Sequence, residues 1–329
     1  MKTPLLFTLL LLSSLLNAEY TNCNFKNENY SDICKSAIKN GVSYQYANKF
    51  ILSYFKKGHE YDEISWKYLQ PNKIKHHTEQ EKKANNVLVK YVPKMVANLK
   101  KYKDVYDYVE KEYGVNREIV AAILLKETKL GKIKPSHDAF VVFNTMLLRT
   151  QANSPREKWL KKMGKTNMVS IINYCYKKGV KPRECRLPSS YAGAVGIPQF
   201  MPNSFIYARP YKREIADLTT MEDAIVSAAY FLHKKAGFTK LIEWKNMPNI
   251  PKVEAEWYLY DFETKDSSFV YESGKNGKKY NSFTKGKKEL AIMREYAKKI
   301  MRYNNSSNYA VGVLRLAYDA HFALKREAK

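Results

Sequence analysis

The chain has 329 residues, 45% of them hydrophobic, which is enough to bury a sizeable core in one or two domains. Its 57 lysines and arginines outnumber the 32 aspartates and glutamates, so the net charge is +25. In a cytosolic protein a charge of this size would indicate nucleic-acid binding, but the N-terminal segment described next argues against that class of partner.

Residues 1–18 have the pattern of a secretory signal peptide. Lys2 precedes an apolar run over 5–16, and Ala18 is a small residue at the position of a cleavage site. The run is shorter than a membrane-spanning helix normally requires. A retained N-terminal anchor is the alternative. Cys23 is not preceded by the small residue that lipoprotein processing requires. We therefore predict an exported, periplasmic protein without a lipid anchor.

Loss of Lys2 with the leader reduces the net charge from +25 to +24. Outside the cytoplasm this charge favours anionic partners, so we expect peripheral association with the cell wall or the membrane surface. We expect no nucleic-acid partner.

The four cysteines indicate an oxidising compartment and up to two disulfides. Three pairings exist, and we predict the two local ones, Cys23–Cys34 and Cys175–Cys185. A zinc site is the competing interpretation, which we set aside because the six histidines do not stand at ligand spacing from these cysteines. No metal site is predicted.

The pattern of apolar residues predicts a mainly helical chain. Residues 44–110 have helical periodicity. Asn116 is a good N-cap for a helix that starts at Arg117, and the unbroken apolar run of 119–125 predicts that this helix is buried on most sides. Further helices are expected at 137–148, 221–233, 287–303 and 309–324, and a polar stretch that carries the second cysteine pair runs to 186. Two short strands, at 257–260 and 268–271, predict a small β element near residues 255–272.

Glu127 follows Ile123 by four residues, which places its carboxyl group on the apolar stripe of a buried helix. A helical glutamate is usually a solvated surface charge, and a buried structural ion pair is a second alternative. The functional interpretation is a general acid, because a desolvated carboxyl group has a raised pKa and holds its proton near neutral pH.

The stretch SYAGAVGIPQFMPNS, residues 190–204, places small residues directly before the amide of Gln199 and the ring of Phe200. Small residues allow close approach of a backbone or a ligand, and an amide both donates to and accepts from sugar hydroxyl and acetamido groups. A tight turn between packed helices is the alternative.

Five segments in order make the chain resemble the lytic murein transglycosylases, specifically the membrane-bound lytic transglycosylase B family. These segments are EYGVNREIVAAILLKETKLG around Glu127, HDAF at 137–140, SYAGAVGIPQFMPNS, EDAIVSAAYF at 222–231 and RYNNSSNYAVGVLRLA at 302–317. The resemblance covers residues 46–324. It implies a lysozyme-like α+β catalytic domain over 111–329, preceded by an N-terminal helical region over 19–110 that packs on it.

The resemblance also implies the roles of individual residues. It implies that Glu127 is the sole catalytic acid and base. It also implies that five residues bind the substrate: Ser190, Gln199, Tyr230, Tyr303 and Asn304. The alternatives for these residues are structural, namely a cap for the serine, core aromatic residues for the tyrosines and a turn for the asparagine.

The implied substrate is the glycan strand of peptidoglycan, cleaved at the β-1,4 bond between N-acetylmuramic acid and N-acetylglucosamine with formation of a 1,6-anhydro ring. This lyase reaction needs no cofactor. One alternative is a muramidase, in which a second carboxylate such as Asp138 or Glu184 activates water. The other is a non-catalytic protein that binds peptidoglycan.

Two features depart from the pattern of the family. Its best-known members carry a calcium-binding loop after the segment that corresponds to residues 190–204. In this chain residues 206–221 offer only Glu214 and Asp217, without the required spacing. We therefore predict no calcium ion. Pro198 stands where a glycine often precedes the glutamine, so the resemblance does not define the backbone path at Gln199.

Overall fold

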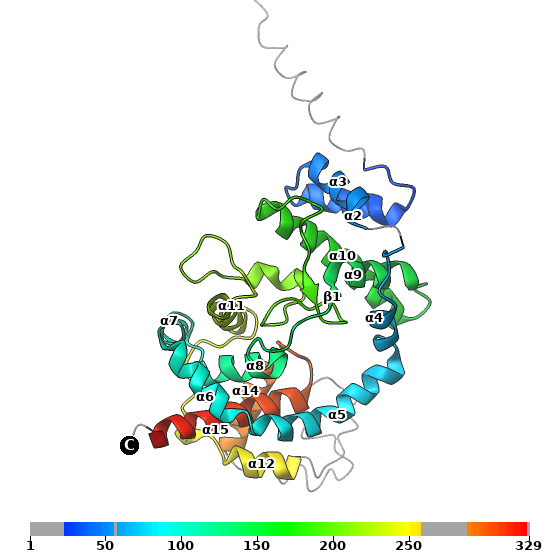
Figure 1. Cartoon of the computed structure of the whole chain (residues 1–329). Coiled ribbons are helices and arrows are strands. Elements are labelled where there is room, and N and C mark those ends of the chain that lie inside the picture. Colours follow the sequence, from blue (N-terminus) through cyan, green and yellow to red (C-terminus); the bar gives the residue numbers. More distant parts are fainter. Residues whose placement is uncertain (1–22, 56–57, 258–287, 328–329) are drawn as a thin grey trace, which may run out of the picture. The chain divides into compact units, whose positions relative to one another are not determined.

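The structure of the protein is a computed structural model that describes residues 23–55, 58–257 and 288–327. The predicted signal peptide of residues 1–18 lies outside the described residues. The described elements are helices, apart from one pair of two-residue strands (Figure 1). None of the described helices combines the length and the apolar character needed to span a bilayer.

The chain divides into two compact units. The first comprises the described residues up to Leu69, Pro135–Val195 and Phe200–Phe205, and the second comprises the remaining described residues. Residues 110 and 111, where the sequence predicts a domain boundary, both lie inside one helix of the second unit.

The first unit contains five α-helices and the sheet among its described residues. These are α2 (Glu28–Lys39), α3 (Tyr44–Tyr54), α4 (Glu63–Tyr68), β1 (His137–Asp138), α9 (Ala139–Arg149), α10 (Pro155–Lys177) and β2 (Pro188–Ser189). The strands are antiparallel, with His137 opposite Ser189. The core forms mainly where α10 packs on α9, and Gly164 allows this approach because a Cβ there would lie 2.7 Å from the Phe143 carbonyl oxygen. Two disulfides join Cys23 to Cys34 and Cys175 to Cys185, the local pairings named above.

The second unit is built around α8 (Arg117–Thr128), whose residues 119–125 are almost completely buried. It packs against α15, α6, α11 and α7, so it is covered on most sides, as the unbroken apolar run predicts (Figure 1). The other helices described here are α5 (Pro71–Val89), α6 (Val92–Lys101), α7 (Lys103–Tyr113), α11 (Met221–Lys234), η2 (Trp244–Asn246), α12 (Ile250–Trp257), α14 (Lys288–Ile300) and α15 (Ser307–Glu327). The short 3-10 helix η1 (Pro202–Tyr207) begins in the first unit and ends in the second.

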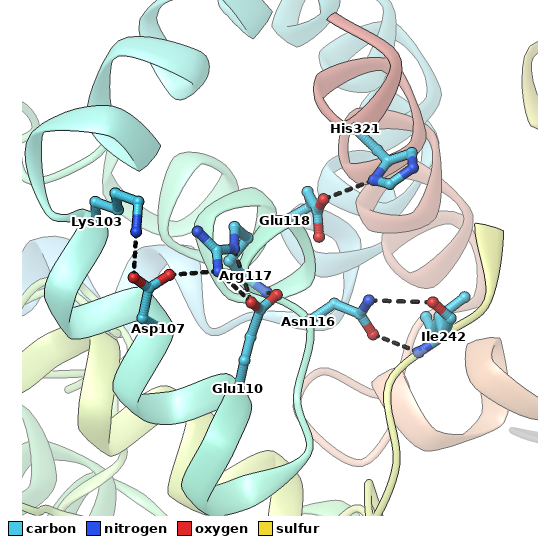
Figure 2. Close-up of polar contacts among 8 residues, drawn as sticks. All are labelled: Lys103, Asp107, Glu110, Asn116, Arg117, Glu118, Ile242 and His321. Atoms are coloured by element: carbon cyan, nitrogen blue, oxygen red, sulfur yellow. Dashed lines mark hydrogen bonds and ion pairs between the residues drawn. The ribbon is translucent and has the colours of Figure 1, made fainter. Parts of the chain in front are cut away.

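The start of α8 differs from the expectation. Asn116 precedes the helix, but its side chain makes no capping hydrogen bond. Instead its amide oxygen accepts from the backbone N–H of Ile242 at 2.6 Å, and its amide nitrogen donates to the Ile242 carbonyl at 3.3 Å (Figure 2). Asn116 therefore does not cap α8. Its side chain instead binds the backbone of Ile242, 126 residues further along the chain.

Ion pairs hold the same end of α8. Arg117 bonds to Glu110 and Asp107 of α7, and Glu118 accepts a hydrogen bond at 2.8 Å from His321 of α15 (Figure 2). With one end fixed to neighbouring helices in this way, the position of the opposite end, which carries Glu127, is constrained as well.

Two predicted segments differ in extent or type. The polar stretch before residue 186 contains the 23-residue helix α10, which starts at a complete capping box of Ser154 and Glu157. Residues 255–257 are the last residues of α12, and the rest of the predicted β element near 255–272 lies outside the described residues. The helices expected at 221–233 and 309–324 are confirmed as α11 and α15.

Candidate functional site

The site lies at the C-terminal end of α8, in the second unit. The helix ends because Lys129, Leu130 and Gly131 all have positive φ angles of 50°, 58° and 77°. The N–H groups of Lys129 and Leu130 donate back to the carbonyls of Leu125 and Leu124 at 2.9 and 3.1 Å, a Schellman-type end. Glu127 therefore lies in the last turn of a helix whose C-terminus is capped by these backbone hydrogen bonds.

Thr128 connects this helix end to the turn that carries Gln199. Its hydroxyl donates to the Ile197 carbonyl at 3.0 Å and accepts from the Gly131 N–H at 3.0 Å. The turn is packed tightly, since Gly196 has a φ of +76° and a Cβ there would lie 2.5 Å from Leu218. Only glycine combines this backbone conformation with this approach.

Gln199 is held in a strained conformation with a φ of 50°. Its amide nitrogen donates to the Gly196 carbonyl at 2.9 Å, so the amide oxygen and the second amide proton are the groups it can offer to a ligand. Tyr303 donates to the carbonyl of Pro198 at 2.6 Å. The proline that departs from the family pattern is thus the residue by which Tyr303 is connected to the turn, while the neighbouring Asn304 is exposed.

Glu127 is partly buried, and its Oε1 accepts a hydrogen bond of 2.6 Å from the hydroxyl of Tyr309. Desolvation raises the pKa of Glu127 to about 7, although the Tyr309 hydrogen bond and the charge of Lys126 oppose the rise. Burial and the nearby charge of Glu127 raise the pKa of Tyr303 and of Tyr309 well above the usual value, so both phenols stay protonated as donors. A carboxyl group that titrates near neutral pH can both give and accept a proton.

Tyr230 on α11 is a partly exposed member of an aromatic cluster. Its ring lies 5.5 Å from that of Tyr113 and 6.5 Å from that of Tyr207, and the guanidinium of Arg209 stacks over it at 3.9 Å. Arg209 is itself fixed, because Ser227 of α11 bonds to its backbone N–H and carbonyl. A sugar ring can pack on such a surface.

Ser190 belongs to the first unit, whereas Glu127 and the other predicted site residues belong to the second. The Ser190 hydroxyl accepts from the N–H of Ala194 at 3.2 Å, and its N–H donates to the Ala194 carbonyl at 2.9 Å. Within its unit, Ser190 closes a tight turn with Ala194.

Three residues beside Glu127 were not identified from the sequence: Tyr309, Lys126 and Glu81. The tyrosine begins the apolar face of α15 and has the pattern of a core residue. The lysine is one of many in a lysine-rich chain. The glutamate lies 46 positions upstream in α5, and no local pattern connects it with Glu127.

Comparison with known proteins identifies similar chains. A profile of the family described as the transglycosylase SLT domain matches residues 26–318. No curated protein matches the chain. The calcium complex of Escherichia coli lytic transglycosylase SLT35 is 19% identical with a TM-score of 0.57, covering 91% of this chain and 94% of that one.

Two Pseudomonas aeruginosa structures give the same picture. The soluble lytic transglycosylase SltB1 is 18% identical with a TM-score of 0.55, covering 91% of this chain and 100% of that one. SltB3 in complex with NAG-anhNAM-pentapeptide is 16% identical with a TM-score of 0.55, covering 88% of this chain and 77% of that one. The likeness confirms the predicted mainly α, lysozyme-like fold class.

The chain between residues 190–204 and the first turn of α11 does not fit a calcium ion. Asp223, the buried carboxylate of that first turn, accepts from the N–H groups of Tyr211 and Asp217 at 2.8 and 2.7 Å and lies 3.3 Å from Arg213. Among the described residues, no group of three or more His, Cys, Asp or Glu is arranged to hold a metal ion.

Proposed function

The chain belongs to the transglycosylase SLT domain family, and we propose that Glu127 is the catalytic acid and base with which it cleaves peptidoglycan as a lytic transglycosylase. The observation that carries this assignment is the raised pKa of the Glu127 carboxyl group, together with its hydrogen bond from Tyr309. Burial raises the pKa of Glu127 to about 7, and a phenol holds one of its two oxygens at 2.6 Å.

In the first step Glu127 acts as the acid. Tyr309 occupies Oε1, so Oε2 carries the proton that passes to the β-1,4 oxygen between N-acetylmuramic acid and N-acetylglucosamine. As the bond from C1 to that oxygen breaks, the acetamido oxygen of the muramic acid bonds to C1. The acetamido group thereby supplies the nucleophile for which most glycosidases use a second carboxylate.

In the second step the Glu127 carboxylate accepts the proton of the muramyl C6 hydroxyl. The C6 oxygen bonds to C1, the bond from C1 to the acetamido oxygen breaks, and a 1,6-anhydro ring closes. The carboxyl group regains its proton, and neither water nor a cofactor is consumed. The Tyr309 hydrogen bond stabilises the carboxylate formed between the two steps.

The substrate class is supported by the site and by one comparison. SltB3 was solved with NAG-anhNAM-pentapeptide. In the present chain, the residues assigned to glycan binding in the second unit offer an amide, a partly exposed aromatic ring and an exposed side-chain amide: Gln199, Tyr230 and Asn304. We assign Ser190 and Tyr303 to the same role, with Tyr303 acting through the turn at Pro198.

The muramidase alternative needs a second carboxylate that is free to activate water. Asp138 accepts from the Tyr54 hydroxyl at 2.7 and 2.9 Å, and its Oδ1 also accepts from the N–H groups of Phe140 and Val141. It is therefore committed to the start of α9. Glu184 is exposed and lies 3.6 Å from Lys181. These contacts favour the single-carboxylate reaction.

Mass spectrometry of digested sacculi tests the reaction. We expect products that end in 1,6-anhydromuramic acid, each one water lighter than the corresponding reducing end. Reducing ends alone would identify a muramidase and overturn the proposal. Glu127→Gln is the matched control, because it keeps the shape of the side chain and removes the proton.

The proposed location is the periplasm, where peptidoglycan lies. The N-terminal pattern of residues 1–18 supports export, and both disulfides favour an oxidising compartment. N-terminal sequencing of the protein from a periplasmic extract should start at Glu19. Recovery of the intact N-terminus in the membrane fraction would favour the retained anchor instead.

A further inference from the structure

Lys126, the residue directly before Glu127, is a buried lysine: its side chain is only 4% exposed. Lysines are rarely buried unless they are paired. The ammonium group donates to the amide oxygen of Asn85, lies 3.9 Å from the Glu81 carboxylate, and lies 4.9 Å from the centroid of the Tyr309 ring. A charge is thus enclosed beside the proposed catalytic carboxyl group.

The two polar partners of Lys126 also hold the start of α15. Glu81 accepts from the hydroxyl of Ser306 at 2.5 Å, and Asn85 donates to the carbonyl of Asn308 at 2.8 Å. The Ser306 hydroxyl in turn accepts from the N–H of Tyr309 at 3.1 Å. The same contacts therefore position the ammonium group and the phenol that bonds to the catalytic carboxyl group.

Close packing fixes this arrangement. Asn85 is 2% exposed and occupies the space where Gly312 of α15 lacks a side chain, since a Cβ there would lie 2.2 Å from the Asn85 amide oxygen. The acceptor of the Lys126 hydrogen bond is held between two helices and has little freedom to move.

The charges around Lys126 oppose one another. Burial lowers the pKa of Lys126, and the carboxylates of Glu81, Glu127 and Glu254 raise it. Several other charged or titratable groups on α8 and on the elements around it have partners of their own. These are Arg315 with Glu254 and Asp319, His321 with Glu118, Arg117 with Asp107 and Glu110, Lys100 with Glu327, Arg213 with Asp223, and His233 with the Tyr113 and Phe238 carbonyls.

We propose that Lys126 is a positioning residue whose ammonium group, held by Glu81 and Asn85, favours the ionised form of Glu127, and that Glu81 moderates this effect. The inference rests on the proposed function, in which one carboxyl group gives a proton in the first step and accepts one in the second. Because both protonation states are needed in each cycle, a pKa near the working pH serves the reaction best. Burial alone would favour the protonated form too strongly.

Two substitutions with opposite expected effects test this role. Lys126→Met removes the positive charge, so the high-pH limb of the kcat/KM profile is expected to move up by about one pH unit. Glu81→Gln removes the negative charge, so the same limb is expected to move down. A merely structural role would lower activity or stability in both variants without shifting their high-pH limbs in opposite directions.

Direct titration of Glu127 provides a second readout that does not depend on turnover. In protein labelled with ¹³C at glutamate side chains, the Glu127 carboxyl signal is the one missing from Glu127→Gln. Its midpoint is expected to rise in Lys126→Met and to fall in Glu81→Gln. Lys126→Arg, which keeps the charge, and Lys132→Met, which removes an exposed charge of the same unit, are expected to leave it near the wild-type value.

Midpoints that stay unchanged, or that move in the same direction, in Lys126→Met and Glu81→Gln would overturn the inference. If Lys126→Met does not fold, Glu81→Gln decides through the direction of its shift. Failure of the proposed function is distinguished by the wild-type products, because anhydro ends are judged by their mass and the midpoints are measured without substrate.

Discussion

Glu127 destabilises the protein at the pH at which its proposed reaction runs. Its pKa is raised from an ordinary value of 4.5 to about 7 in the folded chain, so the folded state binds a proton more tightly than the unfolded state. The protonated Glu127 side chain therefore contributes its full share of the unfolding free energy below about pH 4.5. This contribution is lost as the pH rises through 7 and the folded protein has to hold a buried carboxylate. Such a penalty is typical of residues kept for function.

Glu127→Gln is therefore expected to unfold less readily than the wild type above pH 7. The pKa difference corresponds to about 3 kcal/mol of unfolding free energy. Urea unfolding at pH 5 and pH 8 measures it, and the advantage of the variant should be much larger at pH 8. An advantage that does not depend on pH would contradict the raised pKa.

The same variant is expected to lose at least about 100-fold in kcat, since an amide cannot give the proton of the first step. Release of soluble fragments from purified sacculi measures the loss. Equal clearance by the wild type and the variant, or clearance by neither, would show that Glu127 is not the catalyst and would favour a non-catalytic peptidoglycan-binding protein.

Tyr309→Phe removes the hydrogen bond to the carboxyl group and keeps the ring in the core. Bonds to a charged group contribute about 1.5–3 kcal/mol, so we expect kcat to fall by roughly 10- to 100-fold. The pKa of Glu127 should rise, because the bond lowers it. Steady-state kinetics across pH check both effects, and an unchanged profile would show that Oε1 needs no donor.

At the scale of elements, the site depends on the connection between the end of α8 and the turn of residues 196–199. Thr128 bonds to the Ile197 carbonyl, and the Ile197 N–H donates to the Leu218 carbonyl at 2.8 Å. The turn is thus held from two sides, and Gly196 is the residue that allows it to approach Leu218.

Gly196→Ala is expected to be more destabilising than Gly237→Ala, which serves as its matched control. Both glycines have a φ near +75°, but a Cβ at 196 meets Leu218 at 2.5 Å, whereas a Cβ at 237 meets nothing within 4 Å. The left-handed conformation costs about 1–2 kcal/mol in each variant, and only the first adds overlap with a neighbour. Urea unfolding measures the difference, and equal losses would contradict the close approach.

At the scale of the whole molecule, the two units have separate hydrophobic cores. Both disulfides lie in the first unit and close short loops, with sequence separations of 11 and 10. The chain-entropy model gives about 3 kcal/mol for each loop of this size. Glu127, the proposed catalytic residue, and α8 lie in the second unit, which contains no cysteine.

Reduction is therefore expected to weaken the first unit selectively. Hydrogen exchange with and without a reductant should show faster exchange in α10, whereas protection of α8 should change little. Equal loss of protection in both helices would indicate that the units unfold together.

Local patterns were sufficient for much of the fold. The unbroken apolar run of 119–125 predicts the burial of α8, and the apolar periodicity near the C-terminus predicts α15. The long helix α10 was missed because its sequence is polar over most of its length, with its start marked only by the capping box at Ser154.

The sequence by itself determined the buried helix, the unusual position of Glu127 and the family, since these depend on neighbours a few residues apart and on the order of motifs. Only the tertiary structure decided what surrounds the carboxyl group. Tyr309 and Glu81 lie 182 and 46 residues from Glu127 along the chain, and α15 and α5 bring them to it. The pKa of a carboxyl group depends on charge and burial in space, and helical periodicity contains no information on either partner.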